Sequence, residues 1–591
     1  WAQTPSAGQV VFDDVWTQFT PSGSDATAPY QLDDYQLLLD IPGNVDMNVG
    51  AGFHLAALVP TGRLALLRLD SNLRLTAAST QAGGAVEWIQ PRDPGRERDS
   101  WYRGDWLLLQ LPQPLTTPGA TVELRYHGKN VITKVGNGNF FCQDFGWYPM
   151  DPFGPPFQRA SFSMTFQVNH RFTVVATGVR DRNQRDGDVQ ITHWHTPVPL
   201  TVAGFALGDY SEIEQPIKLP DGQSVQVRVF SNNSPDDMLS SINLVAQFNP
   251  GIPIGTLDTK RLAPEAMRQV SQALAFMTTY FGPYPYAGLS VTPILGNYGQ
   301  GWPTLLYLSN LSFLDSTQLH ELGLPESALD LLSFTFRAHE VSHQWWGHRI
   351  SWATPRDQWL SEGFANASAE LFAEQIAGPK QVKSDLEAWK RALTERDRFE
   401  HRPVDVGALW LGTRLASTAD PGAYQTLTYD KGGYVLYMLR QMLWSPGRPN
   451  PDAAFIAMMK DFTSSYANRD ASTADFERIA EKHMTPAMDL DHDHSLKWFF
   501  DEYVYGTGID RLNFHSAVVP DRGRYAITLT VDNPDHWRGL LPVYFYRDDK
   551  HFAVGLLQVD QSRVTARLPS AFAPRKIVAN AMDDMLVEIK Q

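Results

Sequence analysis

His339-Glu340-Val341-Ser342-His343 is the stretch of sequence that decides how the rest of the chain is interpreted. It lies in an apolar pattern of helical period over Ser327–His348, which predicts a helix. Residues four apart lie on one face of a helix, so the two imidazoles can bind one metal ion. Glu340 falls beside them, where it can hold and deprotonate a metal-bound water.

A catalytic zinc site needs a third protein ligand besides the two imidazoles. The string Trp359-Leu-Ser-Glu362-Gly-Phe-Ala365 supplies a candidate in Glu362, which follows His343 after 18 residues in a second helical pattern, Asp357–Ile376. This interval is long enough for one helix to end and the next to pack antiparallel to it. Two histidines and one carboxylate leave a fourth position open, which is typical of a catalytic zinc rather than a structural one. We therefore expect one Zn²⁺ per chain, bound by His339, His343 and Glu362.

These motifs resemble the M1 family of zinc metallopeptidases, the gluzincins that include aminopeptidase N and leukotriene A4 hydrolase. Three further stretches are similar to sequence motifs of this family. They are the flanking His343-Gln-Trp-Trp-Gly347, the later Thr428-Tyr-Asp-Lys-Gly-Gly433 and, more weakly, Phe500–Gly508. The resemblance implies a thermolysin-like catalytic domain, with Glu340 as general base and later proton shuttle. It also implies that the Tyr429 hydroxyl points at the oxyanion of the tetrahedral intermediate.

The sequence departs from the family at one position. Exopeptidases of the family carry a Gly-x-Met-Glu-Asn strand whose glutamate binds the free α-amine of the substrate. The corresponding stretch here is Gly296–Leu308, and Gly301 stands where that glutamate would be. A missing carboxylate removes a charge-assisted hydrogen bond of about 1.5–3 kcal/mol.

Three explanations remain open for the missing anchor. In the first, the second carboxylate oxygen of Glu362, assisted by the Gln300 amide, binds the substrate amine. In the second, another acid replaces the missing glutamate. In the third, the enzyme does not require a substrate with a free N-terminus. The candidate replacement acids are Asp144, Asp151 and Glu321. We expect aminopeptidase action to be weakened or redirected.

Four further residues are predicted to lie at the site. Gly299 and Gly301 would let an edge strand approach the substrate backbone, as strand addition requires, although a bulge before the buried strand Leu305–Leu308 is an equal alternative. Tyr424 either lines the pocket or packs. Asn366, one helical turn after Glu362, is expected to orient a zinc-bound imidazole.

The pattern of apolar residues changes twice along the chain, which predicts a multidomain α+β protein. Residues 1–232 read as an all-β domain, residues 233–511 as the mainly helical, thermolysin-like zinc catalytic domain, and residues 512–591 as a small C-terminal β-sandwich domain. Expected strands are Tyr35–Ile41, Trp106–Leu111, Thr121–Tyr126, Ser161–Val168, Phe172–Ala176, Tyr525–Val531, Leu541–Tyr546, Phe552–Leu557 and Val564–Leu568. Expected helices besides those named above are Pro264–Tyr280, Lys431–Leu443, Asp452–Thr463 and Ser495–Val504.

Composition excludes several classes of protein. The chain has 591 residues, 12% of them aromatic, and a single cysteine, which excludes a disordered chain and a disulfide scaffold. Its net charge of −15 works against binding to a phosphate backbone, so we expect no nucleic-acid partner. No run approaches the roughly 18 apolar residues of a membrane span. The chain opens with Trp1-Ala2-Gln3, and we expect a periplasmic or secreted protein whose signal peptide was removed, with a cytoplasmic location as the alternative.

The function predicted from these features is zinc-dependent hydrolysis of a peptide or small-molecule substrate, aminopeptidase-like but with altered recognition of the N-terminus. Alternatives are an endopeptidase and a hydrolase of a non-peptide electrophile such as an epoxide. A catalytically inactive scaffold is a third, and the presence of Glu340 and Tyr429 argues against it.

Overall fold

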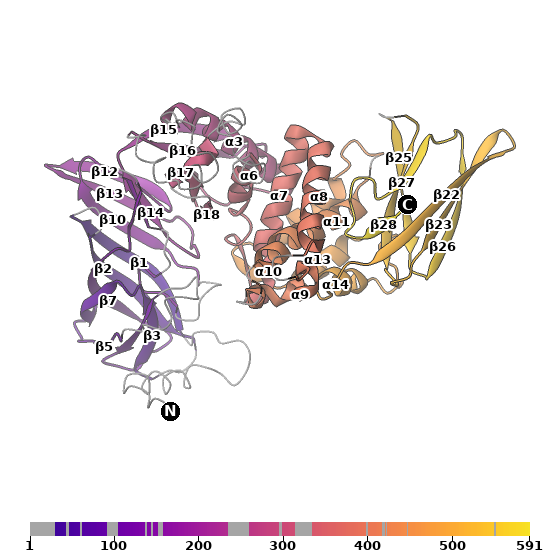
Figure 1. The fold of residues 1–591 in the computed structure, drawn as a ribbon. Helices are drawn as coiled ribbons and strands as arrows, with labels where there is room; N and C mark the ends of the chain where they lie inside the picture. Colours follow the sequence, from indigo (N-terminus) through magenta and orange to yellow (C-terminus); the bar gives the residue numbers. More distant parts are fainter. Residues whose placement is uncertain are drawn as a thin grey trace. The chain divides into compact units, whose positions relative to one another are not determined.

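A computed structural model describes most of the chain (Figure 1). The described residues are 30–42, 46–58, 62–91, 104–135, 139–142, 146–151, 158–233, 259–294, 298–313, 334–396, 400–416, 420, 422–445, 447–548 and 551–591. The chain divides into two compact units, one of Trp1–Ala275 with Tyr284–Gln344 and one of Phe276–Pro283 with Trp345–Gln591.

The first unit is built mainly from β-sheets. Its largest sheet has the strand order β12-β13-β10-β1-β2-β7-β4, in which β1 runs parallel to β10 and antiparallel to β2. Successive residues of β1 alternate between more and less buried positions, and its apolar residues other than Leu38 are buried, as expected of a sheet with one face on the core. The bounds in this sheet are β1 Tyr30–Ile41, β2 Asp46–Ala57, β4 Leu73–Thr80, β7 Ala120–Lys129, β10 Phe162–Asn169, β12 Val179–Asp186 and β13 Val189–His195.

Two smaller sheets accompany it. Their strand orders are β11-β14-β9-β8 and β3-β6-β5. The bounds are β3 Leu64–Leu69, β5 Glu87–Ile89, β6 Asp105–Gln110, β8 Thr133–Val135, β9 Asn139–Cys142, β11 Thr173–Ala176 and β14 Phe205–Gly208.

The strand nearest the motif belongs to a five-stranded sheet in the same unit, with the order β15-β16-β17-β19-β18. Its strands are β15 Tyr210–Lys218, β16 Ser224–Asn232, β17 Gly288–Ile294, β18 Gln300–Trp302 and β19 Leu305–Ser309, followed by the short 3₁₀ helix η1 Asn310–Phe313. The α-helices of this unit that the structure describes are α3 (Thr259–Phe281), whose C-terminal end from Phe276 belongs to the second unit, and α6 (Phe334–Ser342). Among the described strands, β18 forms the edge of this sheet, a position at which a strand can pair with a further chain.

The second unit is helical in its first part. Its central helix, α7 (Trp359–Ala377), is buried along most of its length, which explains why its sequence is apolar around the whole circumference. The other helices are η2 Pro355–Asp357, α8 Pro379–Thr394, α9 Pro403–Val406, η3 Leu409–Leu415, α10 Ala423–Gln425, η4 Thr426–Lys431, α11 Gly432–Leu443, α12 Ala453–Ser465, α13 Thr473–His483 and α14 Lys497–Tyr503. A two-stranded parallel sheet joins β20 (Ile350–Trp352) to β21 (Arg469–Ala471).

The chain ends in two sheets, ordered β26-β23-β22-β28 and β25-β24-β27. Their strands are β22 Arg511–Asp521, β23 Arg524–Asp532, β24 Gly539–Tyr546, β25 Phe552–Val559, β26 Arg563–Ser570, β27 Lys576–Ala579 and β28 Glu588–Lys590. The predicted progression from β structure through a helical middle region to C-terminal β structure is confirmed. Within the described ranges, no helix has both the length and the apolar character needed to cross a membrane.

One predicted helix boundary is wrong. The helix expected to run to His348 ends at Ser342, so His343 is the first residue after α6. The chain turns there because Trp346 forms a β-bridge with Ile350 and Gly347 adopts a φ of +90°. A side chain at Gly347 would place its Cβ 2.4 Å from the Ser361 hydroxyl oxygen, so the turn requires glycine.

Candidate metal centre

The two histidines of the motif turn their outer ring nitrogens toward each other. Nε2 of His339 lies 3.1 Å from Nε2 of His343, and the rings meet nearly edge to face at 79°. α6 provides His339 in its last turn, and His343 follows directly after the helix end, so the four-residue spacing survives the early termination. The arrangement suits one ion that accepts a lone pair from each imidazole.

Glu362 lies in the first turn of α7. The two histidines belong to the first unit and Glu362 to the second. Two imidazoles and one carboxylate are the donor set of many catalytic zinc sites, and the three residues therefore fit the metal that the sequence predicts.

Glu340 is buried, and the backbone of the edge strand lies against it. A Cβ built on Gly299 would lie 2.9 Å from Oε1 of Glu340 and 2.5 Å from the Phe336 ring. A Cβ on Gly301 would lie 2.2 Å from the backbone carbonyl oxygen of Glu340 and 2.9 Å from Cβ of His343. Gly299, which directly precedes β18, and Gly301 within it therefore permit a close approach to α6, and at Gly301 the obstacle to any side chain is backbone.

Gln344 fixes the turn between β18 and β19, a role that the sequence reasoning missed. Its side-chain Nε2 donates to the Trp302 carbonyl at 2.8 Å, and its Oε1 accepts from the Thr304 backbone N–H at 2.8 Å. Thr304 adopts a positive φ of 64°, which such a double anchor helps to hold. The signal was available, because Gln344 directly follows the last histidine of the motif.

The helix that carries Glu362 meets α11 through glycines. A Cβ on Gly363 would lie 2.6 Å from the backbone carbon of Gly432 and 3.0 Å from the backbone nitrogen of Gly433. This close approach explains the Glu362-Gly363 and Lys431-Gly432-Gly433 strings in physical terms. It ties Glu362 to the segment that bears Tyr429.

Tyr429 lies in η4, a π-helical turn, and is half-buried. Such turns occur mostly as single-turn interruptions of α-helices and are frequent at functional sites. The Tyr424 ring lies edge-on to the Tyr429 ring at 6.4 Å between centroids. Burial and the negative charge of Glu362 raise the pKa of Tyr424 above its ordinary value, so this hydroxyl stays protonated beside the carboxylate.

Asn366 donates from Nδ2 to Oδ1 of Asp430 at 3.4 Å, and Asp430 directly follows Tyr429. Burial raises the pKa of Asp430 to about 7 and lowers that of Lys431 to about 8. The Lys431 ammonium donates to the Gly506 carbonyl at 3.1 Å. The orientation of an imidazole by Asn366 stays a prediction; the amide does hold the segment next to Tyr429.

The acids considered as replacements for the missing anchor are placed only in part. Asp144 and Glu321 lie outside the described residues. Asp151 is buried and accepts a hydrogen bond from the Gln158 amide at 3.0 Å. Gln300 is half-buried in β18, opposite Tyr307 of β19.

The part of the chain that bears these residues matches a known protein family. Residues 330–503, which contain the whole motif, match the family model of the Peptidase family M1 domain. The chain carries a peptidase family M1 domain. This domain is of the metallopeptidase type.

Curated relatives support the same family. Aminopeptidase M1-C from Oryza sativa subsp. japonica is 24% identical over 220 residues, which cover 36% of this chain and 22% of that protein. Leukotriene A-4 hydrolase from Xenopus laevis is 24% identical over 159 residues, covering 26% of this chain and 24% of that protein. The matched part thus spans about a quarter or less of these relatives' length.

Solved structures show the same fold over more of the chain. An M1 zinc metallopeptidase from Deinococcus radiodurans matches with a TM-score of 0.58 and 18% identity, covering 82% of this chain and 96% of that chain. Aminopeptidase A from Legionella pneumophila, in complex with aspartic acid, matches with a TM-score of 0.68 and 14% identity, covering 96% of this chain and 60% of that chain. The M1 peptidase domain of this chain is thus set in the multidomain fold of such enzymes.

Proposed function

We propose that this chain is a zinc-dependent peptide hydrolase of M1 type. The observation that carries the proposal is the pair of motif imidazoles, whose Nε2 atoms lie 3.1 Å apart within the part of the chain that matches the M1 domain. When bound there, zinc supplies a Lewis acid that polarises the scissile carbonyl and lowers the pKa of water from 15.7 to about 7.

The residues of the chain perform the proton transfers. Glu340 accepts the proton of the attacking water and later delivers it to the leaving amine. The Tyr429 hydroxyl donates a hydrogen bond to the oxygen on which negative charge develops. β18 offers an open strand edge, along which an extended peptide can pair with its backbone.

The substitution Glu340→Gln tests the proposal. It keeps the shape of the side chain and removes its basicity, so we expect peptide turnover to fall about 10²–10⁴-fold while the zinc content stays that of the wild type. The exposed Glu395 provides the matched control, since Glu395→Gln removes one carboxylate from the surface and is expected to leave turnover unchanged. Wild-type turnover in Glu340→Gln would reject the proposed role.

We also propose that recognition of the substrate N-terminus is altered. The support is steric, because the place of a side chain at position 301 is taken by the Glu340 carbonyl oxygen, 2.2 Å from the Cβ position. An anchoring carboxylate at this position would favour a free amine by about 1.5–3 kcal/mol, or more than about tenfold.

A matched pair of peptides measures this preference. We expect a peptide and its N-acetylated twin to differ less than about tenfold in kcat/KM. A preference of about tenfold or more for the free amine would show that another group performs the anchoring.

A further inference from the structure

A second group of metal-ligating side chains lies on the edge hairpin of the seven-stranded sheet, outside the M1 domain. His193 and His195 lie two residues apart on β13, on one face of the strand, and the buried Trp194 between them faces the core. Asp181 lies on β12, the edge strand next to β13 in this sheet. A His-x-His pair on one strand with an acid on its neighbour brings three ligands to one surface point.

A β-bulge brings the acid into position. The pairing of β12 with β13 shifts between Arg180 and Arg182, so Asp181 is the extra residue in the ladder opposite His193. Bulges redirect a side chain at the cost of ladder regularity. Here the redirected side chain is the carboxylate that meets both imidazoles.

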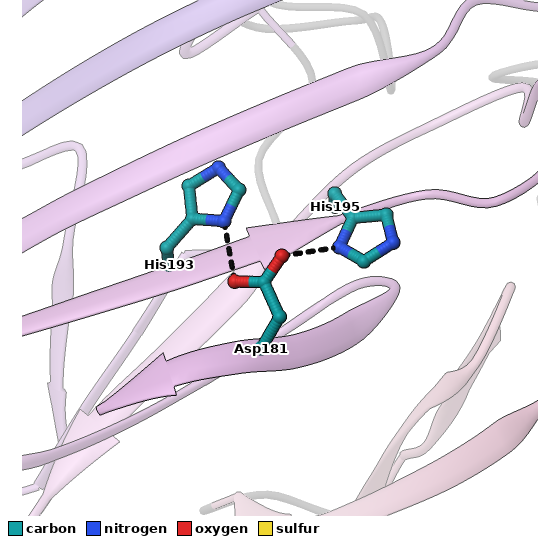
Figure 2. A group of neighbouring side chains, drawn as sticks. All are labelled: Asp181, His193 and His195. Atoms are coloured by element: carbon teal, nitrogen blue, oxygen red, sulfur yellow. Dashed lines mark hydrogen bonds and ion pairs between the residues drawn. The ribbon is translucent and has the colours of Figure 1, made fainter.

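The three side chains converge closely (Figure 2). Nδ1 of His193 lies 2.6 Å from Oδ1 of Asp181, and Nδ1 of His195 lies 2.8 Å from its Oδ2. Nδ1 of His195 is shielded from water and faces the Asp181 carboxylate. In a neutral imidazole, a nitrogen in this position can offer its lone pair to a metal ion beside the carboxylate.

The surroundings keep the ligands oriented. The Ser163 hydroxyl lies 3.0 Å from Nε2 of His193 and holds the opposite edge of this ring, so that Nδ1 points to Asp181.

The neighbouring cations are already engaged. The Arg180 guanidinium pairs with Glu212 at 3.1 Å. The Arg182 guanidinium donates to the Gln184 amide oxygen at 2.9 Å. The negative charge of Asp181 is thus available to a bound cation.

We propose that Asp181, His193 and His195 form a second metal site, which takes a divalent transition-metal ion such as Zn²⁺ and fastens the edge strand β12 to β13. Imidazole and carboxylate donors suit Zn²⁺, Ni²⁺ and Cu²⁺ and disfavour Ca²⁺ and Mg²⁺, which prefer oxygen. The side chains are partly exposed, at 43%, 26% and 40% for Asp181, His193 and His195, so an ion can enter from solvent. The site does not depend on the proposed peptidase function.

Zinc titration of the full-length, metal-stripped chain tests the proposal, with calorimetry for affinity and elemental analysis for stoichiometry. We expect the wild type to bind one zinc ion more per chain than the double variant His193→Ala/His195→Ala. Asp181→Asn should weaken this additional event at least about tenfold.

His170 provides the matched control, because it also pairs with an acid, Asp188, at the other end of the same sheet edge but has no second histidine. His170→Ala should bind as much zinc as the wild type. Circular dichroism and peptide hydrolysis check that each variant is folded.

Equal zinc uptake by the wild type and the double variant would overturn the proposal and leave a metal-free, hydrogen-bonded His-Asp-His group. The comparison holds whether or not the M1 centre binds zinc, because it measures the difference of one ion between two chains that share that centre.

Discussion

Gly301 is the position at which the sequence predicts that an amine-binding carboxylate is missing. The strand that bears it lies so near α6 that a Cβ would meet a backbone oxygen, which cannot move as a flexible side chain can. Packing therefore favours glycine at this position.

Restoring the carboxylate should therefore fail. We expect Gly301→Glu to lower the free energy of unfolding by about 1–3 kcal/mol or more through overpacking, and to lower kcat/KM because β18 must move away from Glu340. Gln300→Glu adds the same charge one residue earlier and should fold like the wild type. Thermal unfolding and peptide kinetics of the wild type, Gly301→Glu and Gln300→Glu test this expectation. A Gly301→Glu variant that is as stable as the wild type and gains a preference for free amines would contradict it.

Asp430, beside Tyr429, makes stability depend on pH. Burial raises its folded pKa to about 7, whereas the unfolded value is about 3.9. Between these values the folded chain binds a proton that the unfolded chain releases, so this group's contribution to stability falls as the pH rises from about 4 to about 7.

Asp430→Asn removes this titration and should give a shallower fall in the free energy of unfolding between pH 5 and pH 8. The variant should gain stability relative to the wild type at pH 8. Denaturant unfolding at several pH values measures the slope, and a slope equal to that of the wild type would show that Asp430 does not carry the effect.

At the scale of elements, the contact between α7 and α11 joins the helix of Glu362 to the segment that bears Tyr429. Glu362 directly precedes Gly363, and Gly432 directly follows the π-helical turn that contains Tyr429. The contact between these two glycines therefore sets the distance between α7, which carries Glu362, and the turn that carries Tyr429.

Alanine within a helix normally stabilises relative to glycine by up to about 1 kcal/mol. We expect the opposite sign for Gly363→Ala, about 1–3 kcal/mol of destabilisation, because its Cβ would meet the backbone of Gly432. Gly447→Ala is the control, since no atom lies within 4 Å of its Cβ position. Unfolding midpoints report both variants, and a more stable Gly363→Ala would show that the helices can separate freely.

Helices and strands whose apolar residues recur with a clear period could be predicted from the sequence. Elements that depend on tertiary contacts could not. Helices α8 and α13 were missed although each carries a start signal: Pro379 follows Gly378, and Ser472 forms a capping box with Asp475. The π-helical turn at Thr426–Lys431 has no such signal, because the packing of its neighbours decides it.

At the scale of the whole molecule, the order of β, helical and β regions followed from the change of period along the sequence. The metal motif could be read from the sequence because its ligands are set by short spacings within and between helices. The bulge that gathers Asp181, His193 and His195 could not, since it depends on the register between strands. Likewise, the closeness of β18 to Glu340 depends on how a sheet edge packs on a helix.

The most direct test of the central claim is anomalous diffraction from crystals of the purified chain at the zinc absorption edge. The account predicts a peak in contact with the two motif imidazoles and the Glu362 carboxylate, at about 2.0–2.2 Å from each ligand atom. A map without a peak there, or with the Glu362 carboxylate directed away from His339 and His343, would contradict the account.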